Sequence, residues 1–204
     1  MPKRAKIFWT SYADLMTSLF FIMLVLFVLA IAMMKRQQKT TEEQLKRIVE
    51  IQNSVKELNP NYFHYQDVYK RFSLNEQIQF RAKSSEIPVE NKQYLIDVGK
   101  DIQRLIETLK TKYIGQEIKY MIIIEGMSSA FRYSKNDVLS YERAFSLFKL
   151  WEDNNIYFDP DICELQIAGS GVRGVGRHTG RMEYKNQQFL IQIIPKIGKL
   201  DTNE

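Results

Sequence analysis

The chain has 204 residues, which is enough for one compact domain with an appendage but not for two full catalytic domains. Its net charge of +5 is modest and spread along the chain, so charge alone does not indicate nucleic-acid binding. The single Cys163 excludes an intramolecular disulfide and a zinc site built from cysteines. His64 and His178 are isolated, and no set of nucleophile, base and acid can be assigned. We therefore predict no enzyme activity, cofactor, metal site or direct contact with nucleic acid.

The chain begins with a long apolar segment. Residues 15–34 carry no charge, and at about 1.5 Å per residue a helix over them spans a hydrocarbon core of ~30 Å. The segment is too long for the apolar part of a signal peptide, and no small-x-small cleavage site precedes Lys35. Basic residues flank both ends and leave the orientation open. We predict a tail over 1–6 and a single uncleaved transmembrane helix over 7–34, with the folded mass on its C-terminal side.

Asp14 lies about two turns inside this apolar segment. A charged side chain at mid-membrane costs roughly 2.5–3.5 kcal/mol on insertion scales, so such a residue has a partner or a function. Hydroxyl side chains one turn before and after it lie on the same helical face: Thr10, Thr17 and Ser18. This pattern favours an ion-carrying carboxylate. The alternative is a carboxylate at headgroup level, with Trp9 and Tyr12 as interfacial anchors.

A helical connector is expected over residues 35–61, which are rich in Lys, Gln and Glu. Residues 35–59 contain neither glycine nor proline, and Asn59-Pro60-Asn61 is expected to stop the helix. Apolar residues follow a 3-4-3-4 spacing at Ile48, Ile51, Val55, Leu58 and Tyr62. This narrow seam is typical of a short coiled coil and predicts pairing of two parallel helices. The alternative is that the seam packs on the chain's own globular domain.

Residues 62–204 have a mixed α/β (α+β) pattern. Strands are expected over 77–81, 119–125, 165–168 and 189–195, and helices over 89–113 and 137–154. The expected order is β-α-β-α-β-β. The run Gly169-Ser-Gly171-Val-Arg-Gly174 satisfies a dinucleotide-binding pattern, but no helical pattern follows it, so we reject that interpretation.

The membrane segment carries a recognisable signature. Trp9-Thr-Ser-Tyr-Ala-Asp14-Leu-Met-Thr17 resembles the signature of the MotB family, in which the aspartate carries an ion through a motor stator. The continuation Ser18-Leu-Phe-Phe-Ile-Met-Leu-Val-Leu-Phe27 is more similar to the ZorB proteins of Zorya anti-phage systems than to flagellar MotB. This resemblance implies that Asp14 relays the transported ion, H⁺ or Na⁺ with H⁺ preferred.

A second signature lies in the globular part. Asn136-Asp-Val-Leu139-Ser140-Tyr-Glu-Arg143-Ala144 resembles the Asn-x-x-Leu-Ser-x-x-Arg-Ala motif of OmpA-like peptidoglycan-binding domains. The resemblance implies that Arg143 pairs with the carboxylate of diaminopimelate in wall peptides, in a turn built by Asn136, Leu139 and Ser140. From the residues alone, Asn136 and Ser140 can equally be helix caps and Arg143 a surface charge.

Two departures from that family weaken the predicted wall contact. Ser129 stands where the family has an aspartate, and a serine cannot pair with the ammonium group of diaminopimelate. Gln187 and Gln188 stand where the family has two arginines. Binding is therefore expected to be weak, altered in ligand, or dependent on two domains per complex.

Taken together, the resemblance implies a stator subunit in the bacterial inner membrane, with its N-terminus in the cytoplasm and its C-terminal domain in the periplasm. A homodimer would sit inside a ring of MotA- or ZorA-like multi-span subunits and hold the peptidoglycan. Two alternatives stay open at this stage. One is a flagellar stator subunit, and the other is a passive membrane-to-wall tether without ion flow.

Overall fold

The computed structural model describes residues 3–115, 118–129 and 133–197. Contacts divide the chain into two units, Met1–Arg47 and Ile48–Asn203. The first element, α1 (Lys3–Ser54), is one continuous helix, as its sequence without glycine or proline predicts. It includes the segment predicted to cross a membrane and runs on through most of the predicted connector.

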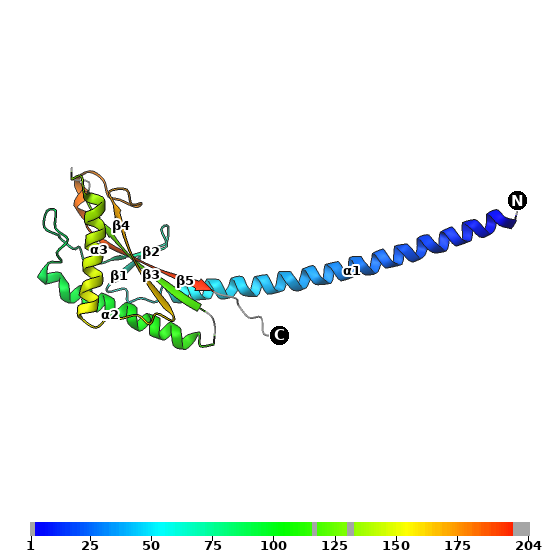
Figure 1. Ribbon diagram of the computed structural model, residues 1–204, viewed down its shortest axis with the longest axis horizontal. Coiled ribbons are helices and arrows are strands. Elements are labelled where there is room, and N and C mark those ends of the chain that lie inside the picture. Colours follow the sequence, from blue (N-terminus) through cyan, green and yellow to red (C-terminus); the bar gives the residue numbers. More distant parts are fainter. Residues whose placement is uncertain (1–2, 116–117, 130–132, 198–204) are drawn as a thin grey trace. The chain divides into compact units, whose positions relative to one another are not determined.

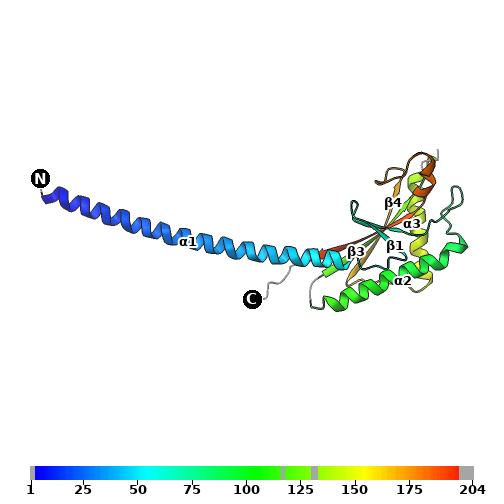
Figure 2. The same cartoon turned by 180° about the vertical axis from the view of Figure 1, so that it is seen from behind.

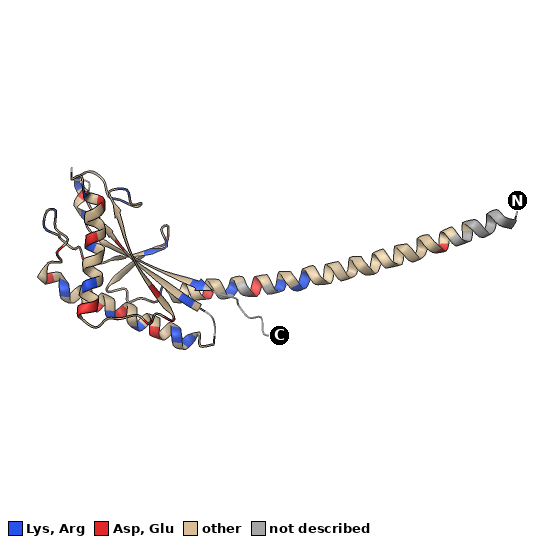
Figure 3. Ribbon diagram, in the orientation of Figure 1, with Lys and Arg blue, Asp and Glu red and all other residues tan. Residues whose placement is uncertain are grey.

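The N-terminal unit is an exposed apolar helix. In the described part of the chain, α1 is the one helix long and apolar enough to cross a membrane. Its uncharged stretch is continuous in Figure 3, with charged residues on either side. The side chains of this stretch are exposed, which is costly in water and favourable in lipid. The structure therefore agrees with a single N-terminal span.

The end of α1 belongs to the globular unit. Ile51, Val55 and Leu58 are 1%, 4% and 6% exposed and lie in the core of the domain. The prediction that these residues pair two helices is therefore wrong, and the alternative, packing on the chain's own domain, is confirmed for them. The helix also ends at Ser54, five residues before Asn59. A turn follows, in which Val55 N still donates to Ile51 O at 3.1 Å.

The domain is a five-stranded sheet with two helices (Figure 1). The strands lie in the order β1-β2-β5-β3-β4, and β3 and β4 are parallel whereas the other neighbours are antiparallel. The elements are β1 (Phe63–Gln66), β2 (Arg71–Leu74), α2 (Val89–Lys112), β3 (Ile118–Met127), α3 (Asn136–Asp153), β4 (Cys163–Gly171), the 3-10 helix η1 (Gly180–Asn186) and β5 (Phe189–Ile197). This arrangement confirms the mixed α/β class and the expected order from the first long helix onward.

The predicted strand over 77–81 is not formed. Its apolar residues Ile78 and Phe80 are buried as the alternation requires, but the segment has no ladder partner and is irregular. The strands that precede α2 are instead β1 and β2, a short hairpin that the sequence did not reveal. Lys70 precedes β2 with a φ of 51°, a left-handed conformation that glycine or asparagine usually adopts.

Both helices cover one face of the sheet, seen from opposite sides in Figures 1 and 2. This follows from right-handed crossovers between β2 and β3 and between β3 and β4. Trp151 of α3 is 1% exposed, and its Nε1 donates to Leu95 O of α2 at 2.9 Å. Gly99 allows this contact, because a Cβ there would lie 2.6 Å from the indole nitrogen. The helices are thereby fixed to one another above β3.

Candidate functional site

Two glycines bring the start of α3 directly against the parallel strand pair. Gly126 of β3 and Gly169 of β4 are register partners. A Cβ at Gly126 would lie 2.1 Å from Ser140 O, and one at Gly169 would lie 2.5 Å from Tyr141 N. The glycine-rich run therefore serves close packing between helix and sheet. The next helix is the short η1, which begins at Gly180, so the rejected dinucleotide pattern has no α-helix after it.

Hydroxyl groups fix the first turns of α3 to the strand ends. Ser140 Oγ donates to Asp137 O at 2.7 Å and accepts from Gly171 N at 2.9 Å. Ser128 Oγ donates to Asn136 O at 3.2 Å. The N-cap position is Lys135, so Ser140 lies in the second turn and is not a cap. The predicted Leu139 is 5% exposed and contributes packing.

Arg143 projects from α3 into a buried environment. It is 3% exposed, so the alternative of a surface charge is wrong. Its Nε donates to Ser84 O at 3.1 Å and its Nη1 donates to Met127 O at 3.3 Å. The guanidinium lies 4.2 Å from the ring centroid of Phe80, a cation–π distance. Two segments that are distant from α3 in sequence, residues 80–84 and the end of β3, thus hold this one side chain.

No described carboxylate neutralises Arg143. Three other described arginines near the ends of β3 and β4 are paired: Arg71 with Glu125, Arg173 with Asp137, and Arg177 with Glu183. Arg143 has no such ion pair among the residues that the structure describes. Burial lowers the pKa of Arg143 to about 10, which leaves it charged at neutral pH. An anion placed against this guanidinium would therefore be strongly favoured.

A loop between β2 and α2 covers Arg143. Ser84 N donates to Arg81 O and Glu86 N donates to Ser84 Oγ, both at 3.1 Å, which folds the loop into a compact turn. Lys83 at its tip has a φ of 58°, and its Nζ lies 5.5 Å from the ring centroid of Tyr133. The loop over 81–86 therefore reaches across Arg143 to the segment that precedes α3.

Ser129 has a neutral environment. It is 7% exposed, and its Oγ accepts a hydrogen bond from Gln187 Nε2 at 3.2 Å. Gln77 Nε2 donates to Gln187 O at 2.7 Å and holds that segment in place. The substitutions noted in the sequence, Ser129 and Gln187, thus contact each other. A hydroxyl and an amide thus occupy the places where the family resemblance implied an aspartate and an arginine.

Arg177 was not identified as a site residue from the sequence. It contacts the backbone near the ends of β3 and β4. Its Nη1 donates to Gly171 O at 3.0 Å and its Nη2 donates to Ser128 O at 2.7 Å. Asn186, fully buried, accepts from His178 N at 2.8 Å and shapes the same loop. No periodic pattern marks this loop, so the sequence offered no signal for Arg177. Within the described residues, no cluster of three or more His, Cys, Asp or Glu is arranged to hold a metal.

The predicted ion-carrying residues all lie on α1. Thr17 Oγ1 donates to Ala13 O at 2.7 Å and Ser18 Oγ donates to Leu15 O at 2.9 Å, so both hydroxyls bond their own helix. They share a helical face with Asp14 but do not donate to its carboxylate. Thr10 was also predicted to be an ion-carrying residue, but its side chain lies outside the described part of the structure. The aromatic pair Trp9 and Tyr12 makes an edge contact at 6.4 Å between ring centroids.

Comparisons with known proteins find relatives only among solved structures. No family model matches the chain, and no curated protein matches it. The periplasmic domain of Helicobacter pylori MotB (residues 78–256) matches with 14% identity and a TM-score of 0.44, over 69% of this chain and 92% of that domain. An outer membrane protein from Borrelia burgdorferi B31 matches with 19% identity and a TM-score of 0.41, over 65% and 95%.

A third solved structure, the peptidoglycan-associated lipoprotein from Burkholderia pseudomallei, matches with 8% identity and a TM-score of 0.38. That match covers 59% of this chain and 91% of the lipoprotein. Such identities and TM-scores are too low to assign a family or a function.

Proposed function

We propose that this chain is a membrane-anchored subunit that holds the peptidoglycan wall through Arg143. The observation that carries the proposal is a buried guanidinium without a carboxylate among the described residues, in a domain that follows a helix able to cross a membrane. A guanidinium has five N–H donors, and its fork matches a carboxylate. Described residues use two of these donors. The proposed ligand group is the diaminopimelate carboxylate of wall peptides.

Access to Arg143 requires a movement of the loop over 81–86, because only 3% of the residue is exposed. Arg143 Nε donates to the backbone carbonyl oxygen of Ser84. A neutral carbonyl is a weaker acceptor for a guanidinium than a carboxylate is. A ligand carboxylate can therefore replace Ser84 O when the loop opens. The left-handed Lys83 at the loop tip marks the strained point of this turn.

The neutral pair of Ser129 and Gln187 sets the strength of this contact. It can hydrogen-bond a ligand but offers no charge for an ammonium group. We expect a dissociation constant near 1 mM for one domain, which corresponds to about −4 kcal/mol. Two domains held in one complex would bind more tightly, because the second contact becomes intramolecular.

The proposed role of the membrane helix is ion relay. Asp14 sits in the apolar span beside Thr17 and Ser18, in a run that resembles the MotB signature. A single helix cannot form an ion path alone, so the proposal includes a ring of MotA- or ZorA-like multi-span subunits. Each charge that crosses 100 mV releases roughly 2.3 kcal/mol, which repeated transfers can convert into rotation. A passive tether, the rival function, has no use for this carboxylate.

Pairing of two copies is proposed to run through the membrane helix, because the connector seam is buried in the domain. Six exposed side chains line an apolar concavity on α1: Met16, Leu19, Phe20, Met23, Leu24 and Phe27. At about 100° per residue, this stripe lies on the side of the helix opposite Asp14. Pairing through the stripe would turn both Asp14 carboxylates outward, toward the surrounding ring.

The system in which the motor works is proposed to be Zorya anti-phage defence, with a flagellar stator as the alternative. The residues from Ile51 onward already belong to the folded domain. Only a short part of α1 therefore lies between the apolar span and the domain, which leaves little room for the separate plug helix that flagellar forms carry. This short link supports the defence role.

Replacement of Asp14 tests the ion relay. Asp14→Asn keeps the size of the side chain but cannot titrate, so phage protection is expected to be lost while expression and membrane insertion stay normal. Glu43→Gln makes the same chemical change on the same helix outside the apolar span and should retain protection. Full protection by Asp14→Asn at normal expression would rule out the relay and leave the passive tether.

A further inference from the structure

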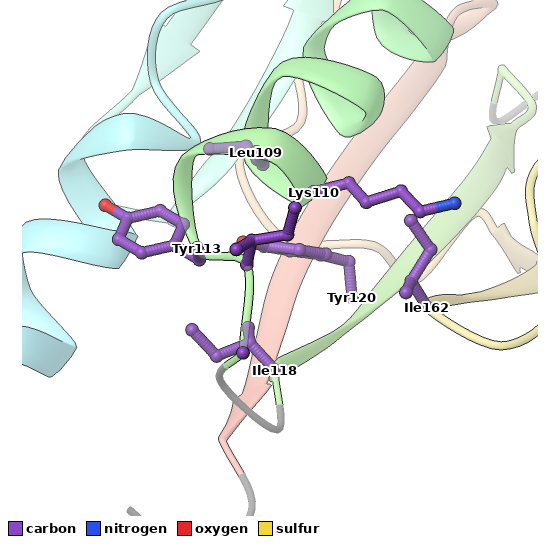
Figure 4. Close-up of a pocket in the computed structure, with 8 residues that line it drawn as sticks. Leu109, Lys110, Tyr113, Ile118, Tyr120 and Ile162 are labelled. Carbon is purple, nitrogen blue, oxygen red and sulfur yellow. The ribbon is translucent and has the colours of Figure 1, made fainter.

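A cavity of about 190 Å³ lies between the last turn of α2, the start of β3 and the segment that leads into β4. Figure 4 shows the side chains around it, which are apolar apart from one ammonium and two hydroxyl groups: Leu109, Lys110, Tyr113, Ile118, Tyr120 and Ile162. An engineered apolar cavity of ~150 Å³ holds benzene, so this one has room for a molecule of similar size.

The hydroxyl group of Tyr120 gives this cavity its chemistry. Tyr120 is 2% exposed, and its Oη is the one buried side-chain polar atom, among the residues the structure describes, without a hydrogen-bond partner. Burial, with a smaller contribution from Tyr113, raises the pKa of Tyr120 to about 12, so the hydroxyl is a donor at neutral pH. Native structures rarely keep a buried donor without an acceptor. The missing acceptor therefore points to a ligand.

The other polar side chains around the cavity are already engaged. Lys110 Nζ donates to Asp159 Oδ2 at 2.8 Å, and Tyr113 Oη shares a hydrogen bond with Ser54 Oγ at 2.9 Å. A buried water needs two to four polar partners, and Tyr120 is the one lining side chain whose polar group has no partner among the described residues. A molecule with an apolar body and one acceptor matches the lining better, because it fills the apolar walls and satisfies the hydroxyl.

We propose that this cavity binds a small neutral organic molecule with an apolar body and one hydrogen-bond acceptor, such as a ketone, an ester or an ether. Tyr120 Oη donates to that acceptor, and the aliphatic walls from Leu109, Ile118 and Ile162 surround the apolar body. The site takes a neutral ligand because the one cation at its edge, Lys110, is already paired with Asp159.

The cavity adjoins the point where α1 meets the domain. Tyr113 forms one wall, and its ring extends in Figure 4 away from Tyr120 toward the end of α1. Its hydroxyl bonds Ser54, the last residue of α1, and Lys112 Nζ donates to the same Ser54 Oγ at 2.8 Å. A bound molecule would therefore stiffen the end of α2 that holds the last turn of α1.

Cyclohexanone is a suitable probe because it is water-soluble, of benzene size, and carries one carbonyl acceptor. Its binding to the full-length, detergent-solubilised chain is measured by ligand-observed NMR titration, with empty micelles as the blank. We expect saturable binding with a dissociation constant on the order of 1 mM. Tyr120→Phe keeps the ring but removes the donor, and it should weaken binding by about 3- to 10-fold.

Tyr113→Phe is the matched control, because it makes the same change in a lining residue whose hydroxyl faces Ser54. It should bind cyclohexanone as the wild type does. Tyr120→Phe without the probe should also unfold at the same temperature as the wild type or higher, since it removes a buried donor without a partner. Equal affinity of Tyr120→Phe and wild type, or no saturable binding in the millimolar range, would overturn the proposal.

Discussion

The two faces of the sheet each bury an arginine, and the two arginines have opposite surroundings. Arg71 is 2% exposed and its Nη1 lies 3.6 Å from Glu125 Oε2, which Gln192 also approaches at 3.5 Å. Glu125 alternates along β3 with the core residue Ile124, so this pair lies on the face away from α2 and α3. Arg143 lies on the helix-covered side and has no described carboxylate.

Arg71 is a structural charge, whereas Arg143 is the charge that we propose to be functional. Arg71 is held by its ion pair, by Gln66 Oε1 at 3.0 Å and by Val175 O at 2.8 Å, so it is fully used within the fold. Arg143 is desolvated without the compensation that a carboxylate provides, which makes it costly to the fold. A buried cation without a carboxylate partner is a candidate site for an external anion.

The largest effect is expected from Arg71→Met. This change leaves Glu125 buried without its cation, and breaking a buried pair on one side typically costs about 3–5 kcal/mol. The free energy of unfolding, measured by denaturant titration, should fall by that amount. The double variant Arg71→Met/Glu125→Leu removes both charges and should recover most of the loss. A loss below about 1 kcal/mol for Arg71→Met would contradict a structural role for the Arg71–Glu125 pair.

A smaller loss is expected when α3 is pushed away from the sheet. In Gly126→Ala the new methyl group meets the backbone oxygen of Ser140, so α3 must shift or the sheet must distort. Overpacking of this kind costs about 1–3 kcal/mol in the free energy of unfolding. Because α3 carries Arg143, wall binding should weaken at the same time. A variant with wild-type stability and binding would show that α3 is not fixed by this contact.

Ser129→Asp tests the contribution of charge to the proposed wall contact. A carboxylate at this position supplies a counter-charge for the ammonium group of diaminopimelate, which Ser129 lacks. Affinity for soluble diaminopimelate-containing wall fragments, measured by NMR titration, should rise by up to about tenfold, the equivalent of roughly 1.4 kcal/mol. Ser129→Asn has the same shape without the charge and should leave the affinity near that of the wild type. Equal gains in both variants would refute the electrostatic explanation.

The connector shows what sequence periodicity can and cannot establish. The spacing of Ile51, Val55 and Leu58 correctly identified an apolar stripe that must be buried. The spacing carries no information on the partner, because a second copy and the chain's own domain offer similar apolar surfaces. The domain therefore starts at Ile48, well before the residue 62 that the sequence suggested.

The regular elements were predictable where their patterns were long. The apolar run of β3 and the helical spacing of α2 and α3 gave bounds that agree with the structure to within two residues. The hairpin of β1 and β2 was missed because each strand has four residues and its turn lacks the usual glycine or asparagine. At 77–81 the alternation of apolar and polar residues correctly predicted which side chains are buried. A strand also needs a hydrogen-bonded neighbouring strand, which this segment lacks.

The residues of the candidate site could be predicted from the motif, but the residues that surround Arg143 could not. The motif predicted that Arg143 and Ser140 lie near each other in the first part of α3, and the structure brings both to the ends of β3 and β4. The cover over Arg143 comes from Ser84, which lies 59 residues away in sequence. A local sequence pattern cannot predict a contact at such a separation. It also cannot predict that no described carboxylate lies beside Arg143, so both findings came from the structure.

Arg143→Met tests the central claim most directly, because it separates stability from binding. Methionine fills the space without a charge, so the free energy of unfolding should change by no more than about 1 kcal/mol, or rise. Co-sedimentation of the full-length protein with purified peptidoglycan sacculi should nevertheless be lost, while the double variant Arg71→Met/Glu125→Leu should still sediment. If Arg143→Met sediments with sacculi as well as the wild type does, Arg143 does not hold the wall and the proposed function is contradicted.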